Sequence, residues 1–263
     1  MDSKEGDNVK IRKTMILGIF LLIMTGMGGI GVSSGYSTTI MPTLDQSTSI
    51  IWEVLQTPTA PVQSYWTGGG YWITQSHANM TFAVESVDDD VTGRLTLGNM
   101  TVLTNDTMIS RDLALGVWGV VEFSPGLFIE TNSTAITKLI ITAYEAAERV
   151  KWNYLNGTMH AHYDTYTIND VEYNCIFFEY QQDPTSFGTP QHTQLIYSLS
   201  TGILLYANTS YYFGEPYQPY HFEIKFLAIE HHGTMPNPMI LYAVVSSGIL
   251  VIGVVLILSR RRH

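Results

Sequence analysis

Two histidines and an aspartate at alternate positions, His160, His162 and Asp164, are the side chains best spaced to do chemistry. Alternate residues of a β-strand share a face, so these three would line up as ligands of one metal ion must. Their use by a metal-dependent surface enzyme is one hypothesis. However, the next histidine of metallo-hydrolase motifs is missing, and a solvent-facing strand contains the same residue types. We therefore expect no catalytic residue, no cofactor and no bound metal.

Four other patterns have simpler structural interpretations. The G-x-S-x-G at residues 31–35 lies in a small-residue region of the N-terminal segment, not between a strand and a helix. Residues 88–93 match the start of a calcium loop, but the twelfth position is Asn99 instead of glutamate, which favours a hairpin turn. Cys175, the only cysteine, excludes an intrachain disulfide and lies in a strand-like run, so we expect it to be buried. His231-His232 precedes the C-terminal apolar segment and is interpreted as part of a spacer.

Aromatic residues in predicted loops are the remaining candidates for contact with a partner. They flank a run of three glycines and a proline-containing loop: Tyr65, Trp66, Tyr71, Trp72, Tyr217 and Tyr220. Exposed Tyr and Trp offer a large contact area at low entropic cost. The sequence leaves open whether these rings contact a partner or pack in the core around tight turns.

Six Asn-x-Ser/Thr sequons lie between two apolar segments of the chain: Asn79, Asn99, Asn105, Asn132, Asn156 and Asn208. The chain has 11 asparagines, and chance would place only about two of them in sequons, given its Ser and Thr content. We expect several of the six to carry glycans. Asn156 is the first candidate, because an Asn156-Gly157 hairpin turn would hold its side chain in solvent.

The elements that would position these residues are mainly β-strands. Short apolar or alternating runs, separated by Gly, Asp, Asn or Pro, predict an antiparallel sheet. The expected strands cover residues 50–55, 80–84, 94–97, 101–104, 116–123, 151–155, 158–168, 171–180, 193–199, 203–213 and 221–230. Asn156-Gly157 and Asn169-Asp170 would turn successive strands into hairpins. The expected fold class is mainly β (α+β), with the strands in an antiparallel meander.

One segment has helical instead of strand periodicity. Its apolar residues recur at intervals of four and three: Ile136, Ile140, Ala143, Ala147 and Val150. Asn132 or Ser133 can accept hydrogen bonds from the free N–H groups of the first turn. The sequence therefore predicts one amphipathic helix that packs on the sheet through its apolar stripe.

Two long apolar segments frame the predicted sheet. Residues 239–258 are 20 consecutive uncharged positions, enough for a helix to cross a bilayer core of about 30 Å. Arg260, Arg261 and Arg262 follow, and such basic clusters mark the cytoplasmic side. Residues 1–35 have a basic start, an apolar run and small residues, the layout of a signal peptide or signal anchor.

These segments define the expected domain organisation. After residues 1–35 we expect an extracellular β-rich domain at 36–230 and a linker at 231–238. A C-terminal transmembrane helix at 239–258, in contact with the lipid bilayer, and a cytoplasmic basic tail at 259–263 complete the chain. If residues 1–35 are not cleaved, the protein crosses the membrane twice instead of once.

The region between the apolar segments is strongly acidic. Of the 13 basic and 23 acidic residues, seven basic and three acidic ones lie in the terminal segments, which leaves 6 basic and 20 acidic residues in between. A surface of this charge repels phosphates, so nucleic acid is not an expected partner.

Residues 195–206, LIYSLSTGILLY, read as a strand, a Thr-Gly turn and a second strand. This unit resembles the strand–turn–strand common in archaeal single-pass membrane-anchored surface proteins of unassigned function. The resemblance implies a surface protein of that kind and no particular activity.

The expected function is that of a membrane-anchored, N-glycosylated cell-surface protein whose ectodomain binds or scaffolds a partner and is not an enzyme. The partner would be an extracellular protein or a glycan. Two alternatives stay open. The chain could be an accessory subunit of a membrane protein complex, or a metal-dependent surface enzyme that uses the His160, His162 and Asp164 strand face.

Protease added to intact cells should digest residues 36–238 and spare residues 260–263, because both apolar segments have their positive charges on the cytoplasmic side. The measurement is an immunoblot for a tag placed after His263, with and without external protease. Loss of the tag from intact cells would contradict this topology.

Overall fold

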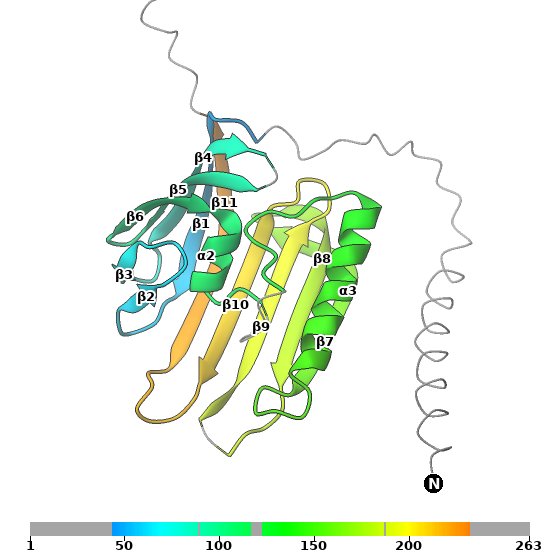
Figure 1. The fold of residues 1–263 in the computed structure, drawn as a ribbon. Coiled ribbons are helices and arrows are strands. Elements are labelled where there is room, and N and C mark those ends of the chain that lie inside the picture. The colour runs from blue at the N-terminus through cyan, green and yellow to red at the C-terminus, as the bar shows by residue number, and fades with distance from the viewer. Residues whose placement is uncertain (1–43, 89, 117–122, 187, 232–263) are drawn as a thin grey trace, which may run out of the picture. The chain divides into compact units, whose positions relative to one another are not determined.

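The computed structural model describes residues 44–88, 90–116, 123–186 and 188–231. Nine of the strands in these ranges form one antiparallel sheet in the order β6-β5-β4-β1-β11-β10-β9-β8-β7 (Figure 1). Their bounds are β1 Thr48–Gln56, β4 Asn79–Val87, β5 Val91–Leu97, β6 Met100–Asn105, β7 Gly157–Ile168, β8 Val171–Gln182, β9 Thr189–Ser198, β10 Leu204–Tyr212 and β11 Tyr220–His231. Two short strands, β2 (Val62–Ser64) and β3 (Gly70–Trp72), form a separate hairpin. The predicted mainly β fold with an antiparallel sheet is confirmed.

Strand β1 lies in the middle of the sheet, although it is the first strand of the chain. It pairs with β4 on one side and with β11 on the other, and Thr48 lies opposite His231. β1 therefore joins two meanders, β4–β6 and β7–β11, into one sheet. The meander was predicted for each half, whereas this pairing between the first and last strands was not.

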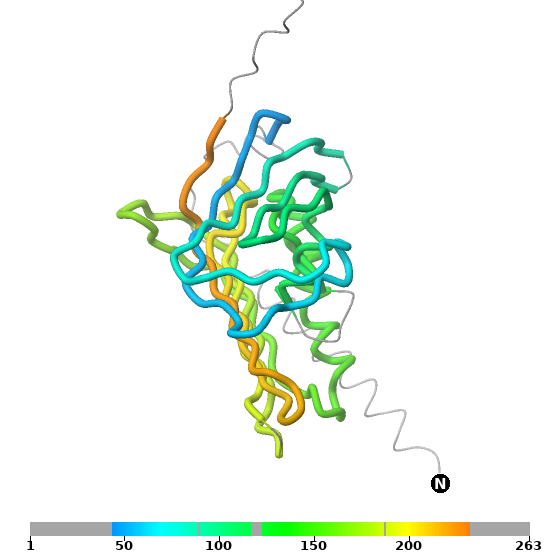
Figure 2. Tube along the Cα trace, turned by 90° about the vertical axis from the view of Figure 1, so that its left-hand side faces the viewer, coloured from blue at the N-terminus to red at the C-terminus, as the bar shows by residue number. Residues whose placement is uncertain are grey.

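Helices α2 (Asp106–Asp112) and α3 (Ser133–Arg149) lie on the same side of the sheet, as Figures 1 and 2 show from two directions. Helix α3 starts as predicted, because Asn132 Oδ1 accepts a hydrogen bond from Ala135 N at 2.8 Å. Its buried residues are Ile136, Ala143, Ala146 and Ala147. The predicted amphipathic helix is confirmed, and the seven-residue α2 was not predicted.

Residues 123–129 cross the same face of the sheet and complete the core. Leu204 N donates to Leu127 O at 3.0 Å, so this segment is bonded to the start of β10. Beneath it, Trp52 is fully buried, with its ring 6.4 Å from that of Phe128. The Trp52 Nε1 also donates to Leu204 O at 2.7 Å. Trp52 of β1 thereby contacts both β10 and residues 123–129.

Residues 151–155 form turns between α3 and β7 and not the predicted strand. The Asn153 side chain accepts a hydrogen bond from Leu155 N at 2.7 Å, and Asn156 N donates to Asn153 O at 3.0 Å. These local bonds occupy the backbone that a strand would need for pairing. The prediction of a hairpin turn at Asn156-Gly157 is therefore wrong.

The later hairpins agree better with the sequence. Asn169 and Asp170, between β7 and β8, have φ values of 50° and 64°, as a type I′ turn requires. Strands β8, β9, β10 and β11 each overlap a predicted strand.

Several predictions fall on residues outside the described ranges. These are the signal or anchor at 1–35, the G-x-S-x-G, most of the linker, the C-terminal transmembrane helix at 239–258, and most of the strand at 116–123. No helix of the described residues is both long and apolar enough to cross a membrane. The membrane predictions therefore stay predictions.

Replacing Trp52 with Phe should lower the free energy of unfolding by about 2–4 kcal/mol, because it leaves a cavity and removes the hydrogen bond to Leu204 O. The matched control is Trp152→Phe, since Trp152 is 90% exposed and its replacement should cost about 0.5 kcal/mol or less. Urea unfolding of both variants measures the difference. Equal losses of stability would show that Trp52 does not hold the core together.

Candidate binding surface

Most exposed aromatic side chains lie at one end of the strands. Thr48 and His231 mark the end where the described chain enters and leaves the sheet. The connections at the opposite strand ends form what we call the far end. The far end carries six of the eight exposed Tyr and Trp residues of the described ranges: Tyr65, Trp66, Tyr71, Trp152, Tyr154 and Tyr217. In Figure 1 the β2–β3 hairpin lies at the left, beside β6 and α2, and the other connections are the loops below β7–β11.

The first group belongs to the aromatic hairpin, which we define as β2, β3 and the turn between them. One carboxylate holds this turn. The backbone N–H groups of Tyr65 and Trp66 donate to Asp112 Oδ1 at 2.8 and 2.9 Å. The N–H and hydroxyl of Thr67 donate to Asp112 Oδ2 at 2.9 and 2.7 Å. Asp112, at the end of α2, therefore accepts four hydrogen bonds, three of them from backbone N–H groups, and these fix the turn that presents two exposed rings.

Two further contacts hold the aromatic hairpin. The Arg111 guanidinium lies 5.0 Å from the ring centre of Trp66, within cation–π range. On the other strand, Asn99 Oδ1 accepts from Ile73 N at 2.9 Å, and Asn99 Nδ2 donates to Tyr71 O at 3.3 Å. A surface fixed in this way loses little conformational entropy when a partner binds.

The second group, Trp152 and Tyr154, was missed because residues 151–155 were predicted as a strand. Gln182 Nε2 donates to Tyr154 O at 2.6 Å, and the Tyr180 hydroxyl donates to Leu155 O. Two side chains of β8 thus hold the backbone of this loop, while the rings of Trp152 and Tyr154 face solvent. The sequence did contain an indication against this strand. Residue 151 follows directly after Val150, the last apolar residue of the predicted helix, so no turn residue separates the predicted helix from the predicted strand.

For Trp72 and Tyr220, of the two alternatives left open by the sequence, packing in the core is the one observed. Trp72 is 1% exposed and packs edge-on against Phe222, with ring centres 5.4 Å apart. Side chains alternate along β3, so Tyr71 faces solvent and Trp72 faces the core. Tyr220 is buried, and its hydroxyl donates to Leu113 O at 2.9 Å. Burial raises the pKa of Tyr220 well above its usual value.

His160, His162 and Asp164 are exposed at alternate positions of β7, on one face as predicted. The His162 ring stacks on Phe177, with ring centres 4.9 Å apart and planes at 18°. Within the part of the chain that the structure describes, no three His, Cys, Asp or Glu side chains are grouped to hold a metal ion. Cys175 is fully buried, and burial raises the pKa of its thiol to about 11.

The six sequons differ in exposure. Asn79, Asn99 and Asn132 are exposed, whereas Asn105, Asn156 and Asn208 are half-buried. Asn156 lies just before β7 instead of in a hairpin turn, and its Nδ2 donates to the Asp183 carboxylate. The physical reason for ranking Asn156 first is therefore absent. Glycosylation itself stays a prediction, with the exposed sequons now favoured.

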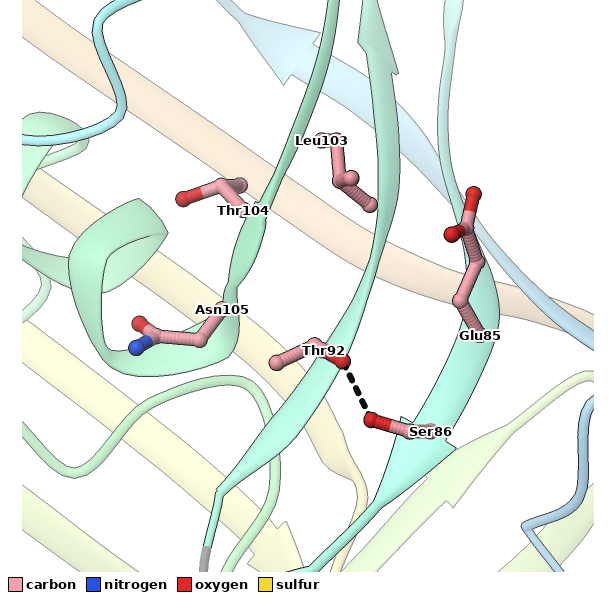
Figure 3. Close-up of a pocket in the computed structure, with 6 residues that line it drawn as sticks. All are labelled: Glu85, Ser86, Thr92, Leu103, Thr104 and Asn105. Atoms are coloured by element: carbon pink, nitrogen blue, oxygen red, sulfur yellow. Dashed lines mark hydrogen bonds between the residues drawn. The ribbon is translucent and has the colours of Figure 1, made fainter.

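A shallow open groove crosses β4, β5 and β6 (Figure 3). It is lined by Glu85, Ser86, Thr92, Leu103, Thr104 and Asn105. Hydroxyls of Ser86 and Thr92 share a hydrogen bond of 2.5 Å. This lining has one carboxylate and no histidine or cysteine, so it supplies neither an acid–base pair nor a strong nucleophile.

Asp106 is a buried carboxyl group beside this groove. It is 4% exposed and accepts a hydrogen bond from Phe128 N at 3.3 Å. Burial, and then the nearby charge of Asp90, raise the pKa of Asp106 to about 7. Gly126 permits this packing, because a Cβ there would lie 2.3 Å from Asp106 Oδ2.

The raised pKa of Asp106 gives a pH dependence of stability with a definite sign. The folded state binds the proton more tightly than the unfolded state, whose pKa is near 3.8, so the benefit is complete below pH 3.8 and is lost as pH rises through about 7. Asp106→Asn should remove this loss, which is at most about 4 kcal/mol. Urea unfolding at pH 5 and pH 8 measures the part of this loss that falls between the two pH values, at most about 3 kcal/mol. Equal pH dependence of variant and native protein would contradict the assignment.

No protein-family model, no curated protein and no solved structure matches this chain.

Proposed function

We propose that the protein is a membrane-anchored, N-glycosylated cell-surface protein whose ectodomain is a non-enzymatic binding module. The observation that supports this most directly is the set of rigidly held, exposed aromatic residues at the far end. The described chain enters and leaves the sheet at the other end, at Thr48 and His231. The apolar segments before and after these residues would attach that end to the membrane and turn the aromatic surface outward.

The composition of the far end favours binding over catalysis. Tyr and Trp supply much of the binding energy at protein interfaces and stack on the faces of sugar rings. The aromatic hairpin is already fixed by Asp112, so ordering costs are low when a partner binds. The partner is an extracellular protein or a glycan, and the acidic surroundings argue against a polyanion.

The exposed sequons fit the same orientation. Asn79 and Asn132 have exposed side chains, so glycans there would extend into solvent. The Asn132 cap would survive modification, because its Oδ1 accepts the hydrogen bond while the glycan replaces only one hydrogen of Nδ2.

The test uses the full chain in lipid nanodiscs against a glycan array and against solubilised cell-envelope protein. Replacing Tyr65, Trp66 and Tyr71 together with Ala should weaken binding at least tenfold, a loss of about 1.4 kcal/mol or more. Val171→Ala is the matched control, since Val171 is also exposed but lies at the start of β8 and not at the far end.

Unfolding midpoints must be equal in the variants and the native chain. A second variant, Trp152→Ala with Tyr154→Ala, shows which of the two groups contacts the partner. If neither set changes binding, or if the native chain binds neither probe, the far end is not a binding surface.

A further inference from the structure

Strand β7 is an unusually long open edge of the sheet. It is the last strand in the sheet order and pairs with β8 through all twelve residues without a register shift. In Figure 1 it lies at the margin of the sheet, beside α3. Exposed edges in natural proteins are usually blunted by proline, lysine or a bulge, because they template pairing with another strand. β7 contains none of these three features, and among the described residues its protection comes only from α3, which packs against it and whose Tyr144 accepts a hydrogen bond from Ala161 N.

Two contacts reveal which backbone groups face the open edge. Ala161 N donates to the Tyr144 hydroxyl at 3.2 Å, and Thr165 N donates to Asp164 Oδ1 at 2.8 Å. Neither N–H therefore points to β8. Because backbone groups alternate along a strand, the odd-numbered residues from Ala161 to Thr165, including Tyr163, present their N–H and C=O groups outward. Two side chains satisfy donors that a further strand would use.

We propose that β7 pairs antiparallel with β7 of a second copy of this chain, with the two-fold axis at Tyr163. Ala161 and Thr165 would then exchange backbone hydrogen bonds with Thr165 and Ala161 of the second copy. On the other face, His162 lies opposite Asp164 of the second copy, and this pair forms twice. The His162 and Asp164 of the sequence motif thus become partners of each other across two chains.

The facing side chains favour the register with its axis at Tyr163 over the registers with the axis one residue earlier or later. Pairing must keep odd residues opposite odd ones, since only these carry outward backbone groups. A two-fold axis at residue 162 would place His162 against His162, and an axis at residue 164 would place Asp164 against Asp164. Like charges directly opposite each other destabilise a sheet, and opposite charges stabilise it. An axis at residue 162 also pairs Asp164 with His160, but of these three registers only the axis at Tyr163 pairs each Asp164 with a histidine without placing two histidines or two aspartates face to face.

The helix face of the same edge is apolar enough to support the contact. Tyr163 is 57% exposed, and Ile141 and Tyr144 of α3 are exposed as well. In the proposed pairing, the two Tyr163 side chains meet at the axis. Tyr144 would release Ala161 N, and Asp164 would turn from Thr165 N to the histidine of the second copy.

This pairing sets the orientation of the two copies. Antiparallel strands point opposite ways, so Thr48 and His231 of one copy lie at the opposite end from those of the other. If the proposed membrane anchorage holds, on which this step rests, the two copies are anchored in two facing membranes. The net negative charge of both copies opposes contact at long range, but salt screens it beyond about 8 Å at 0.15 M.

The experiment is oxidative cross-linking of the full chain in detergent at 0.15 M salt. Tyr163→Cys places two thiols at the axis, where paired Cα atoms about 5.5 Å apart suit a disulfide. Thr167→Cys is the matched control, since it is exposed on the same edge but lies opposite Met159 of the second copy. The native Cys175 is buried and gives little background.

We expect at least tenfold more disulfide dimer from Tyr163→Cys than from Thr167→Cys. In the Tyr163→Cys chain, Asp164→His and His162→Asp should each lower the dimer yield severalfold, and the two changes together should restore it. No dimer, equal dimer from both cysteines, or no restoration by the double exchange would overturn the pairing.

Vesicles of phosphatidylcholine that carry the full chain test the orientation separately. Facing membranes predict vesicle aggregation that the Asp164→His variant lacks. A dimer in detergent without aggregation would contradict the anchorage proposed above while the pairing itself stands.

Discussion

The antiparallel ladder between β1 and β11 is the contact through which one third of the sheet is attached to the rest. It runs from Thr48 opposite His231 to Gln56 opposite Glu223. The residues that pair are separated by most of the described chain, so the ladder must offset the entropy of closing a very long loop. Burial of Trp52 at this ladder, with its hydrogen bond to β10, supplies part of that stabilisation. By strand pairing, β4, β5 and β6 are connected to the second meander only through β1.

The position of the aromatic hairpin depends indirectly on the β1–β11 ladder. Its turn is fixed by Asp112 at the end of α2, and its second strand by Asn99 in the β5–β6 turn. Asn99 connects β5 to β6, and α2 follows β6 directly, so the positions of both residues depend on the part of the sheet that β1 attaches. Helix α2 is in turn linked to residues 123–129 through the buried Asp106 and Phe128. A loss of core packing around Trp52 would therefore loosen the surface that we propose to bind a partner, although no exposed ring contacts Trp52.

Local patterns predicted the second meander well and the arrangement of the whole poorly. Asn169-Asp170 and the apolar spacing in α3 are short-range signals, and both features formed where expected. The position of β1 depends on contacts between distant residues, which leave no local mark on the sequence. Asn156-Gly157 shows a different limit, because a favourable turn pair was overruled by the bonds of Asn153 next to it.

The candidate site was predicted only in part for the same reason. Tyr65, Trp66, Tyr71 and Tyr217 are exposed, but burial of their neighbours Trp72 and Tyr220 depends on which face each strand turns to the core. Composition cannot reveal that orientation for a three-residue strand such as β3. Asp112 accepts the four hydrogen bonds that fix the turn of the aromatic hairpin. Nothing in the sequence indicates this role, since its partners lie more than forty residues earlier.

The side-by-side position of Thr48 and His231 also has a mechanical consequence. A force that pulls these two residues apart would act across the β1–β11 ladder at its end and open its hydrogen bonds one after another, as a zipper opens. A force between His231 and the aromatic hairpin acts along the strands instead and loads many bonds of the ladder at once. A protein held at the chain ends and pulled at its far end is loaded in this second, more resistant direction. The fold is therefore suited to bear tension along the length of its strands.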